Sequence, residues 1–280
     1  MKKNDVQVPV HVFAQPFLAL HLHQTNCDRT PDAPERTQPL VVLHGGPQVP
    51  SDYLFDLAKV DYRSVVFFDQ MGCGRSACPP PGETAQYSIE ASVKDLTTVL
   101  SALGVLNRKY HLLGQSWGGI LAYEFLRSRP PAQECLSLII SNTPTSVAQV
   151  EADVKKQIEL LGGESSPAAD VAAKFRTTHE CRLPERPKLL VDAYAHAGTV
   201  WRGTGAIKSW ALDPNSAKIT QPTLVVRGEH DFVTEASQEQ WKTACPRARF
   251  KSIAGASHHC LLEKTDAYIE MVDAFLAEYD

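Results

Sequence analysis

Apolar runs of four or five residues recur along the chain and predict the strands of a buried sheet. Strands covered on both faces of a parallel sheet are almost continuously hydrophobic. The predicted strands are 39–43, 64–68, 110–113, 136–140 and 222–226, and a further strand-like segment is 249–253. Apolar residues between these runs recur at helical spacing and predict amphipathic helices over 89–103, 120–127 and 271–276. This alternation predicts an α/β fold with a mostly parallel central sheet flanked by helices.

Two parts of the chain depart from this alternation. The opening segments 8–13 and 17–23 predict an antiparallel strand pair at the sheet edge. The stretch 145–218 has no strand-like run and contains charged helical segments, so we expect a helical cap inserted between two strands of the sheet. A cap in that place would cover the carboxyl ends of the strands, where ligands bind in open α/β sheets. We therefore expect an α/β core of 1–144 and 219–280 with a helical cap of 145–218.

The composition is that of an ordinary soluble protein of 280 residues, with 43% hydrophobic and 21% charged positions. The 28 Lys and Arg against 32 Asp and Glu argue against a nucleic-acid partner. The chain starts without a signal-peptide pattern and has no run near the ~18 apolar residues of a membrane span, so we expect a cytoplasmic protein without a membrane partner. Seven scattered cysteines without a Cys-x-x-Cys pair predict reduced thiols. No pattern indicates a metal, a cofactor or a particular oligomeric state.

A Gly-x-Ser-x-Gly motif lies between strand 110–113 and helix 120–127, with Gly114 and Gly118 on either side of Ser116. In this context the motif predicts a nucleophile elbow, a strained turn whose flanking positions have no room for side chains. A serine hydroxyl is a weak nucleophile at neutral pH, and it needs a general base with a carboxylate behind that base. Ser116 is therefore the predicted catalytic nucleophile.

The acid and the base of such a triad are expected after the serine, in that order. Asp231 lies just past strand 222–226, at the carboxyl edge of the sheet, and is the predicted acid. Asp213 is a weaker alternative because it precedes that strand, and Glu229 is interpreted as a structural or solvated carboxylate. The base comes from the pair His258 and His259, either of which could reach the serine. We interpret three other histidines as surface or loop residues: His21, His23 and His230.

The segment His44-Gly45-Gly46-Pro47 directly follows strand 39–43 and lies where a second oxyanion donor is expected. Two backbone N–H groups are needed to stabilise the negative oxygen of a tetrahedral intermediate. The predicted donors are those of Gly46 and Trp117. The glycines, Gly45 included, allow the backbone to approach the substrate closely.

These motifs together resemble α/β-hydrolases of the proline iminopeptidase family. The matching segments are 44–47, 69–76, 114–119, 179–183 and 205–210, with Phe175 and the late Asp231 and His258. Segment 69–76 is the most specific, because Asp-Gln-x-Gly-x-Gly-x-Ser after a strand is common in this family; its Arg75 is interpreted as an ion-pair partner. The resemblance favours His258 over His259, because the base in relatives lies five residues before an acidic residue, here Glu263, that we expect to open the last helix.

The resemblance implies a cofactor-independent peptidase that removes N-terminal residues, especially proline, or a related amidase, acting on a small molecule or a short peptide. Family peptidases hold the substrate's α-ammonium with glutamates at two positions where this chain has Phe232 and Val200. A buried cation without a carboxylate is strongly disfavoured, unless Glu229 or Glu180 takes that part. Two alternatives follow: an esterase or amidase for an uncharged small molecule, and a protein that keeps this fold without hydrolysis.

Overall fold

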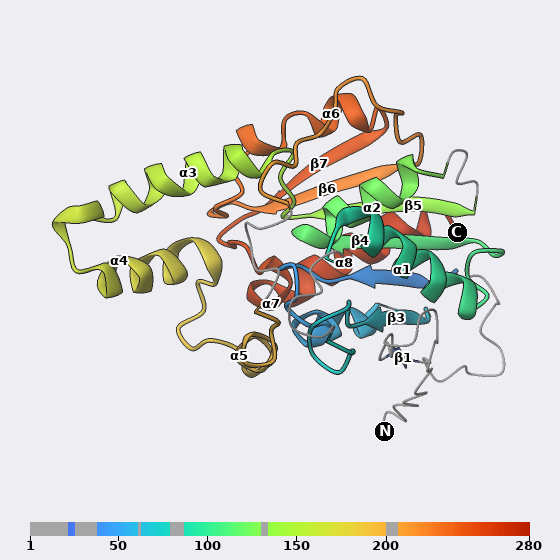
Figure 1. The fold of residues 1–280 in the computed structure, drawn as a ribbon, viewed down its shortest axis with the longest axis horizontal. Coiled ribbons are helices and arrows are strands. Elements are labelled where there is room, and N and C mark those ends of the chain that lie inside the picture. The colour runs from blue at the N-terminus through green and yellow to red at the C-terminus, as the bar shows by residue number, and fades with distance from the viewer. Residues whose placement is uncertain (1–21, 26–37, 61–62, 79–86, 130–133, 200–206) are drawn as a thin grey trace.

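The computed structural model describes residues 22–25, 38–60, 63–78, 87–129, 134–199 and 207–280. Seven strands form one sheet in the order β1-β3-β2-β4-β5-β6-β7 (Figure 1). Their bounds are β1 Leu22–Thr25, β2 Leu40–Leu43, β3 Val65–Phe68, β4 Tyr110–Gln115, β5 Cys135–Ser141, β6 Thr223–Gly228 and β7 Ala248–Ile253. Strands β2 to β7 are parallel to their neighbours, and β1 is antiparallel to β3. The predicted mostly parallel sheet is confirmed.

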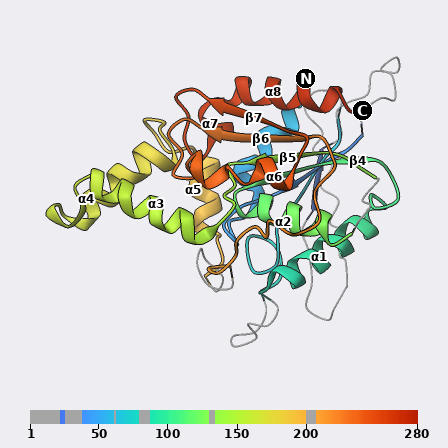
Figure 2. The ribbon, with the colours of Figure 1, turned by 90° about the horizontal axis from the view of Figure 1, so that it is seen from above.

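Helices cover both faces of the sheet, which explains why the central strands are apolar throughout. On one face lie α1 (Ile89–Ala102) and α2 (Trp117–Arg127), and on the other lie α8 (Thr265–Ala277) and the 3-10 helix η1 (Ser51–Lys59) (Figure 2). The side chains of β2 divide between the two faces, with Val41 and Leu43 packed on the first and Leu40 and Val42 on the second. Shorter helices are η5 Ala236–Gln238, α6 Trp241–Ala244 and α7 Cys260–Glu263.

Five helical segments lie between β5 and β6, and residues 147–175 extend beyond the sheet (Figures 1 and 2). They are α3 Val147–Leu160, α4 Ala168–Phe175, the π-helical turn η4 Arg176–Glu180 and α5 Lys188–Ala195, with the short 3-10 helix η3 Gly163–Ser165 between α3 and α4. The side chain of Ser146 caps α3 by accepting a hydrogen bond from the Gln149 N–H (3.3 Å). The division into a core and a cap at 145 and 218 stays a prediction.

One expectation about element bounds lies largely outside the described residues, and another is wrong. Of the predicted N-terminal strand pair, 8–13 and most of 17–23 lie outside the described residues, and β1 pairs with β3. Glu263 does not open the last helix: it ends the short helix α7, and α8 begins at Thr265. The two helices are separate because Lys264, with φ −140° and ψ 54°, leaves the helical conformation between them.

No helix in the described part of the chain is long and apolar enough to cross a bilayer. Among the same residues, no group of three or more His, Cys, Asp or Glu side chains is arranged to hold a metal ion.

Arg75 forms an ion pair with Asp52 at 2.8 Å and a longer one with Asp69 at 3.4 Å, as expected of a structural residue.

Asp95 on α1 has a carboxyl group whose burial raises its pKa from 3.8 to about 6. The unfolded chain therefore releases this proton at lower pH than the folded chain, and the ionised carboxylate destabilises the fold as pH rises from about 4 to above 6. We expect Asp95→Asn to raise the free energy of unfolding by about 1 kcal/mol at pH 7 and to have little effect at pH 3.5, as measured by denaturant unfolding.

The control is Glu90→Gln, which neutralises an exposed carboxylate on the same helix. Glu90→Gln should not raise the free energy of unfolding at either pH, because an exposed carboxylate keeps its hydration in the folded state. Equal stability of Asp95→Asn and the unsubstituted protein at pH 7 would refute the burial argument.

Candidate active site

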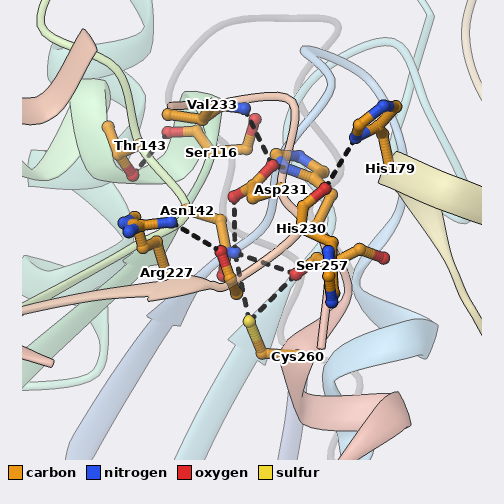
Figure 3. Close-up of polar contacts among 12 residues, drawn as sticks. Ser116, Asn142, Thr143, His179, Arg227, His230, Asp231, Val233, Ser257 and Cys260 are labelled. Carbon is orange, nitrogen blue, oxygen red and sulfur yellow. Dashed lines mark hydrogen bonds and ion pairs between the residues drawn. The ribbon is translucent and has the colours of Figure 1, made fainter. Parts of the chain in front are cut away.

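Ser116 occupies the turn between β4 and α2, with φ 54° and ψ −120°. A positive φ is costly for a residue with a side chain, so the surroundings must hold it. The Ser116 N–H donates to the Ser141 carbonyl (2.8 Å), and the Thr143 hydroxyl donates to the Ser116 carbonyl (3.0 Å; Figure 3). The strained turn from strand to helix that the motif predicted is therefore present, and the serine is partly exposed.

The glycines of the motif allow backbones to touch around this turn. A Cβ atom on Gly114 would lie 2.2 Å from the Gly118 carbonyl oxygen, and one on Gly118 would lie 2.1 Å from the Leu43 carbonyl oxygen. Both distances are far below a van der Waals contact, and both neighbours are backbone atoms that cannot rotate away. Any other residue at these positions would push α2 away from β2 and β4.

Asp231 and His258 are joined by a hydrogen bond of 2.8 Å between Asp231 Oδ1 and His258 Nδ1. They follow β6 and β7, and their exposed fractions are 4% and 5%. Since a carboxylate only accepts, Nδ1 carries the proton and Nε2 is left as the basic nitrogen. Among the described residues the Ser116 hydroxyl takes part in no hydrogen bond, so its contact with His258 stays a prediction.

Asn142 is a site residue that the sequence analysis did not identify. It follows β5 with a φ of 53°, and its Nδ2 donates to Asp231 Oδ2 at 2.7 Å (Figure 3). Its Oδ1 accepts from the Ser141 hydroxyl at 2.7 Å, which fixes the orientation of the amide. The Val233 N–H donates to Asp231 Oδ1 at 2.9 Å. The buried carboxylate thus has a donor on each oxygen besides the imidazole.

His259 has a different environment from its neighbour. Both of its ring nitrogens are buried without a hydrogen-bond partner. Burial, together with the nearby His258, lowers the pKa of His259 well below its ordinary value, so the ring is neutral. It packs edge-on against the Tyr53 ring at 5.2 Å. The structure therefore pairs His258, and not His259, with Asp231.

Three other residues considered in the sequence analysis form hydrogen bonds with other partners. Asp213 accepts from the Asn215 N–H at 2.9 Å. Glu229 is half-exposed and accepts from the Gly255 N–H at 2.8 Å, which lowers its pKa. The partly exposed His230 contributes its carbonyl oxygen, which accepts from His179 Nδ1 at 2.8 Å (Figure 3).

The loop after β2 carries the two glycines predicted to face the substrate. The Gly45 N–H donates to the Tyr53 hydroxyl at 2.8 Å, so it serves that bond and not an oxyanion. A Cβ on Gly45 would lie 2.5 Å from Gln115 Oε1, so this position contributes by lacking a side chain. Gly46 is exposed with a φ of 118°, and Trp117 is the first residue of α2.

Side chains from η1, β4, α2 and the loop after β3 connect this glycine loop to the Ser116 turn. The Tyr53 hydroxyl donates to Gln115 Oε1 at 2.7 Å, and Gln115 Nε2 donates to the His258 carbonyl at 3.3 Å. On the other side, Trp117 Nε1 donates to Gln70 Oε1 at 2.7 Å, and Gln70 Nε2 donates to the His44 carbonyl at 3.0 Å. The glycine loop after β2, the Ser116 turn and the His258 loop are thus held as one hydrogen-bonded unit.

The sequence contained partial signals for these supporting residues. Asn142 directly follows a predicted strand at the same sheet edge as the predicted acid, so its position after the strand was a usable signal. Gln70 belongs to the segment that resembled the family. Tyr53 had no signal, because its role depends on how η1 packs against β4.

Comparison with known proteins places this arrangement in context. The sequence pattern of the alpha/beta hydrolase fold family matches residues 38–265. The proline iminopeptidase of Lactobacillus acidophilus is 29% identical, over 95% of this chain and 97% of that protein. The proline iminopeptidase of Saccharolobus solfataricus is also 29% identical, over 85% of this chain and 84% of that protein.

Two solved structures are similar over most of their length. The proline iminopeptidase of Mycobacterium smegmatis has a TM-score of 0.80 at 27% identity, covering 94% of this chain and 95% of its own. VinJ has a TM-score of 0.81 at 22% identity, covering 94% and 96%, which shows a shared fold.

Asn142 donates a charge-assisted hydrogen bond to the buried Asp231 carboxylate. Loss of this amide should lower the free energy of unfolding. Asn142→Ala loses the amide and keeps a side chain at positive φ, whereas Asn142→Gly loses the amide and relaxes the backbone. We expect Asn142→Gly to lower the free energy of unfolding by about 2 kcal/mol and Asn142→Ala by about 1 kcal/mol more, measured by denaturant unfolding.

The comparison of the two variants separates the amide from the backbone strain. If Asn142→Gly is as stable as the unsubstituted protein, the bond to Asp231 contributes nothing, and the role assigned to this amide is wrong.

Proposed function

The chain belongs to the alpha/beta hydrolase fold family, and from this premise we propose that it is a serine hydrolase. It cleaves amide or peptide bonds of small substrates, in the manner of the proline iminopeptidases that it is similar to. The observation that carries the proposal is the 2.8 Å bond between Asp231 and His258, at the same sheet edge as the strained Ser116 turn. A buried imidazole held by a carboxylate is the base that a serine hydroxyl requires.

The proposed reaction proceeds by acyl transfer. Ser116 Oγ attacks the substrate carbonyl carbon while His258 Nε2 takes the hydroxyl proton, and Asp231 stabilises the imidazolium. The carbonyl electron pair moves to the oxygen, which accepts hydrogen bonds from the N–H groups of Gly46 and Trp117. Collapse of this intermediate breaks the bond to the leaving group, which takes the proton from His258. Water then repeats the sequence on the acyl-enzyme, releasing the acid and restoring Ser116.

The network around the glycine loop supports the assignment of the oxyanion donors. Gln70 bonds both the His44 carbonyl and the Trp117 indole, so the two segments that carry the proposed donors are tied to one side chain. Burial lowers the pKa of His44, and its neutral ring accepts from the Gln70 N–H at 2.8 Å through Nε2. Donors held in advance lose little free energy to reorganisation when charge develops.

A second candidate is an esterase or amidase for an uncharged small molecule, and the surroundings of Asp231 favour it. Phe232 stands directly after Asp231 and stacks on the His258 ring. The carboxylates that could replace a missing ammonium anchor are engaged: Glu180 pairs with Arg186, and Glu229 accepts from the Gly255 N–H. Val200, the other departure from the family, lies outside the described residues.

Removal of the Ser116 hydroxyl should abolish covalent chemistry. We expect Ser116→Ala to lose all labelling by a fluorophosphonate and to reduce hydrolysis by about 10³-fold or more, because no nucleophile remains. Labelling is measured by intact-protein mass spectrometry, and the fold by thermal melting. Ser128→Ala, at the other end of α2, is the matched control and should label normally.

Labelling of Ser116→Ala at the normal rate would show that another residue reacts. Absence of labelling in the unsubstituted chain, with no acyl-enzyme from any ester or amide, would support a protein that keeps this fold without hydrolysis.

A panel of three substrates separates the two candidate functions. It consists of a prolyl arylamide, its N-acetylated analogue and a short acyl ester. The second candidate predicts kcat/KM values for the free and the acetylated amide that differ by less than about tenfold, because Phe232 offers no charge to an ammonium group. A preference of about a hundredfold for the free amine would reject the second candidate and support an aminopeptidase.

A further inference from the structure

Phe232 covers one face of the imidazole that the proposed reaction uses as its base. The two ring centroids lie 4.0 Å apart with an interplanar angle of 29°, which is a stacked arrangement. Phe232 is only partly buried, whereas His258 is 5% exposed. The phenyl ring therefore separates one side of the imidazole from solvent.

The orientation of the His258 ring is fixed from three sides. Its Nδ1 donates to Asp231 at 2.8 Å, Phe232 stacks on one face, and the His259 ring packs against it edge-on at 5.5 Å. The hydrogen bond alone would restrain the ring only at Nδ1 and would leave its plane free to tilt. The stacked ring removes this freedom and holds Nε2 in one direction.

Phe232 is itself held by the inserted helices. The ring of Phe175, the last residue of α4, lies 6.0 Å from it, and the His179 ring lies 5.3 Å from Phe175. His179 also bonds both adjacent loops: its Nδ1 donates to the His230 carbonyl at 2.8 Å, and its own carbonyl accepts from the His258 N–H at 3.2 Å. The position of Phe232 is thus determined by α4 and the π-helical turn.

The chemistry of the base gives this stack an energetic role. The imidazole becomes a cation when it takes the serine proton, and the face of an aromatic ring attracts a cation. The nearby groups that burial keeps uncharged are His259, Cys260 and Tyr53. The charged and titratable groups on the surrounding elements are Asp231, His179, Glu180, Arg186, His230 and Glu263.

We propose that Phe232 is a positioning residue for His258, whose stacked ring holds the plane of the imidazole and stabilises its cationic form. The proposal rests on the proposed function, since it assigns Phe232 a part in base catalysis. It differs from a role in lining the substrate pocket, because it acts on proton transfer whatever the substrate.

The test is the pH dependence of Ser116 labelling by a small fluorophosphonate. Labelling should rise with pH as the imidazole loses its proton. In Phe232→Leu we expect the high-pH plateau to fall about 3- to 30-fold and the midpoint to move to lower pH, because the cation is less stabilised. Phe232→Tyr retains the ring and should restore both values.

The matched control is Phe250→Leu, the same substitution at a half-exposed ring on β7 that lies beside Lys242. It should change the midpoint little, and thermal melting checks that each variant is folded. A normal plateau and midpoint in Phe232→Leu, or the same defect in Phe232→Tyr as in Phe232→Leu, would overturn the proposal.

A second measurement is independent of catalysis. The Cε1–H resonance of His258, followed by NMR against pH, should titrate at lower pH in Phe232→Leu than in the unsubstituted chain, and an unchanged titration would overturn the stabilising role. If the unsubstituted chain is never labelled at Ser116, the proposed function fails, and this titration still decides whether the stack stabilises the cation.

Discussion

The hydrogen bond between Asp231 and His258 is the interaction on which the proposed site depends. A carboxylate that is 4% exposed loses most of its hydration, and the fold must replace it with donors. Those donors are His258 after β7, Asn142 after β5 and the N–H of Val233, which lies with Asp231 in the loop after β6. The need to satisfy one buried carboxylate therefore fixes the relative positions of three loops.

The parallel sheet is what allows these loops to meet. Chain segments that leave parallel strands at their carboxyl ends emerge at one edge, so residues far apart in sequence become neighbours. Close backbone packing at Gly114 and Gly118 then places the N-terminus of α2 against the end of β2. This packing holds the Ser116 turn near the glycine loop, and Gln70 and Tyr53 complete the connection through side chains.

Local pattern and chain order were sufficient to predict the sheet, the Ser116 turn and the pairing partner of the Asp231 carboxylate, once the resemblance favoured His258. The residues that support them were harder to predict, because Asn142 and Tyr53 act through contacts between loops that no local pattern encodes. The Gly45 N–H donates to a tyrosine eight residues later in the chain, a contact that no local pattern indicates. Glu263 was assigned to the wrong helix because the non-helical backbone at Lys264, which separates α7 from α8, has no signal in the sequence.

The adjacent residues His258 and His259 show how the fold assigns different chemistry to identical side chains. Full burial without partners keeps His259 neutral, whereas His258 has a carboxylate at Nδ1 and an aromatic ring on one face. The π-helical turn contributes to both environments, because the carbonyls of His179 and Glu180 accept from the two backbone N–H groups. The bonds make this turn part of the frame that holds the proposed base, so a change in α4 or the turn also alters the orientation of that base.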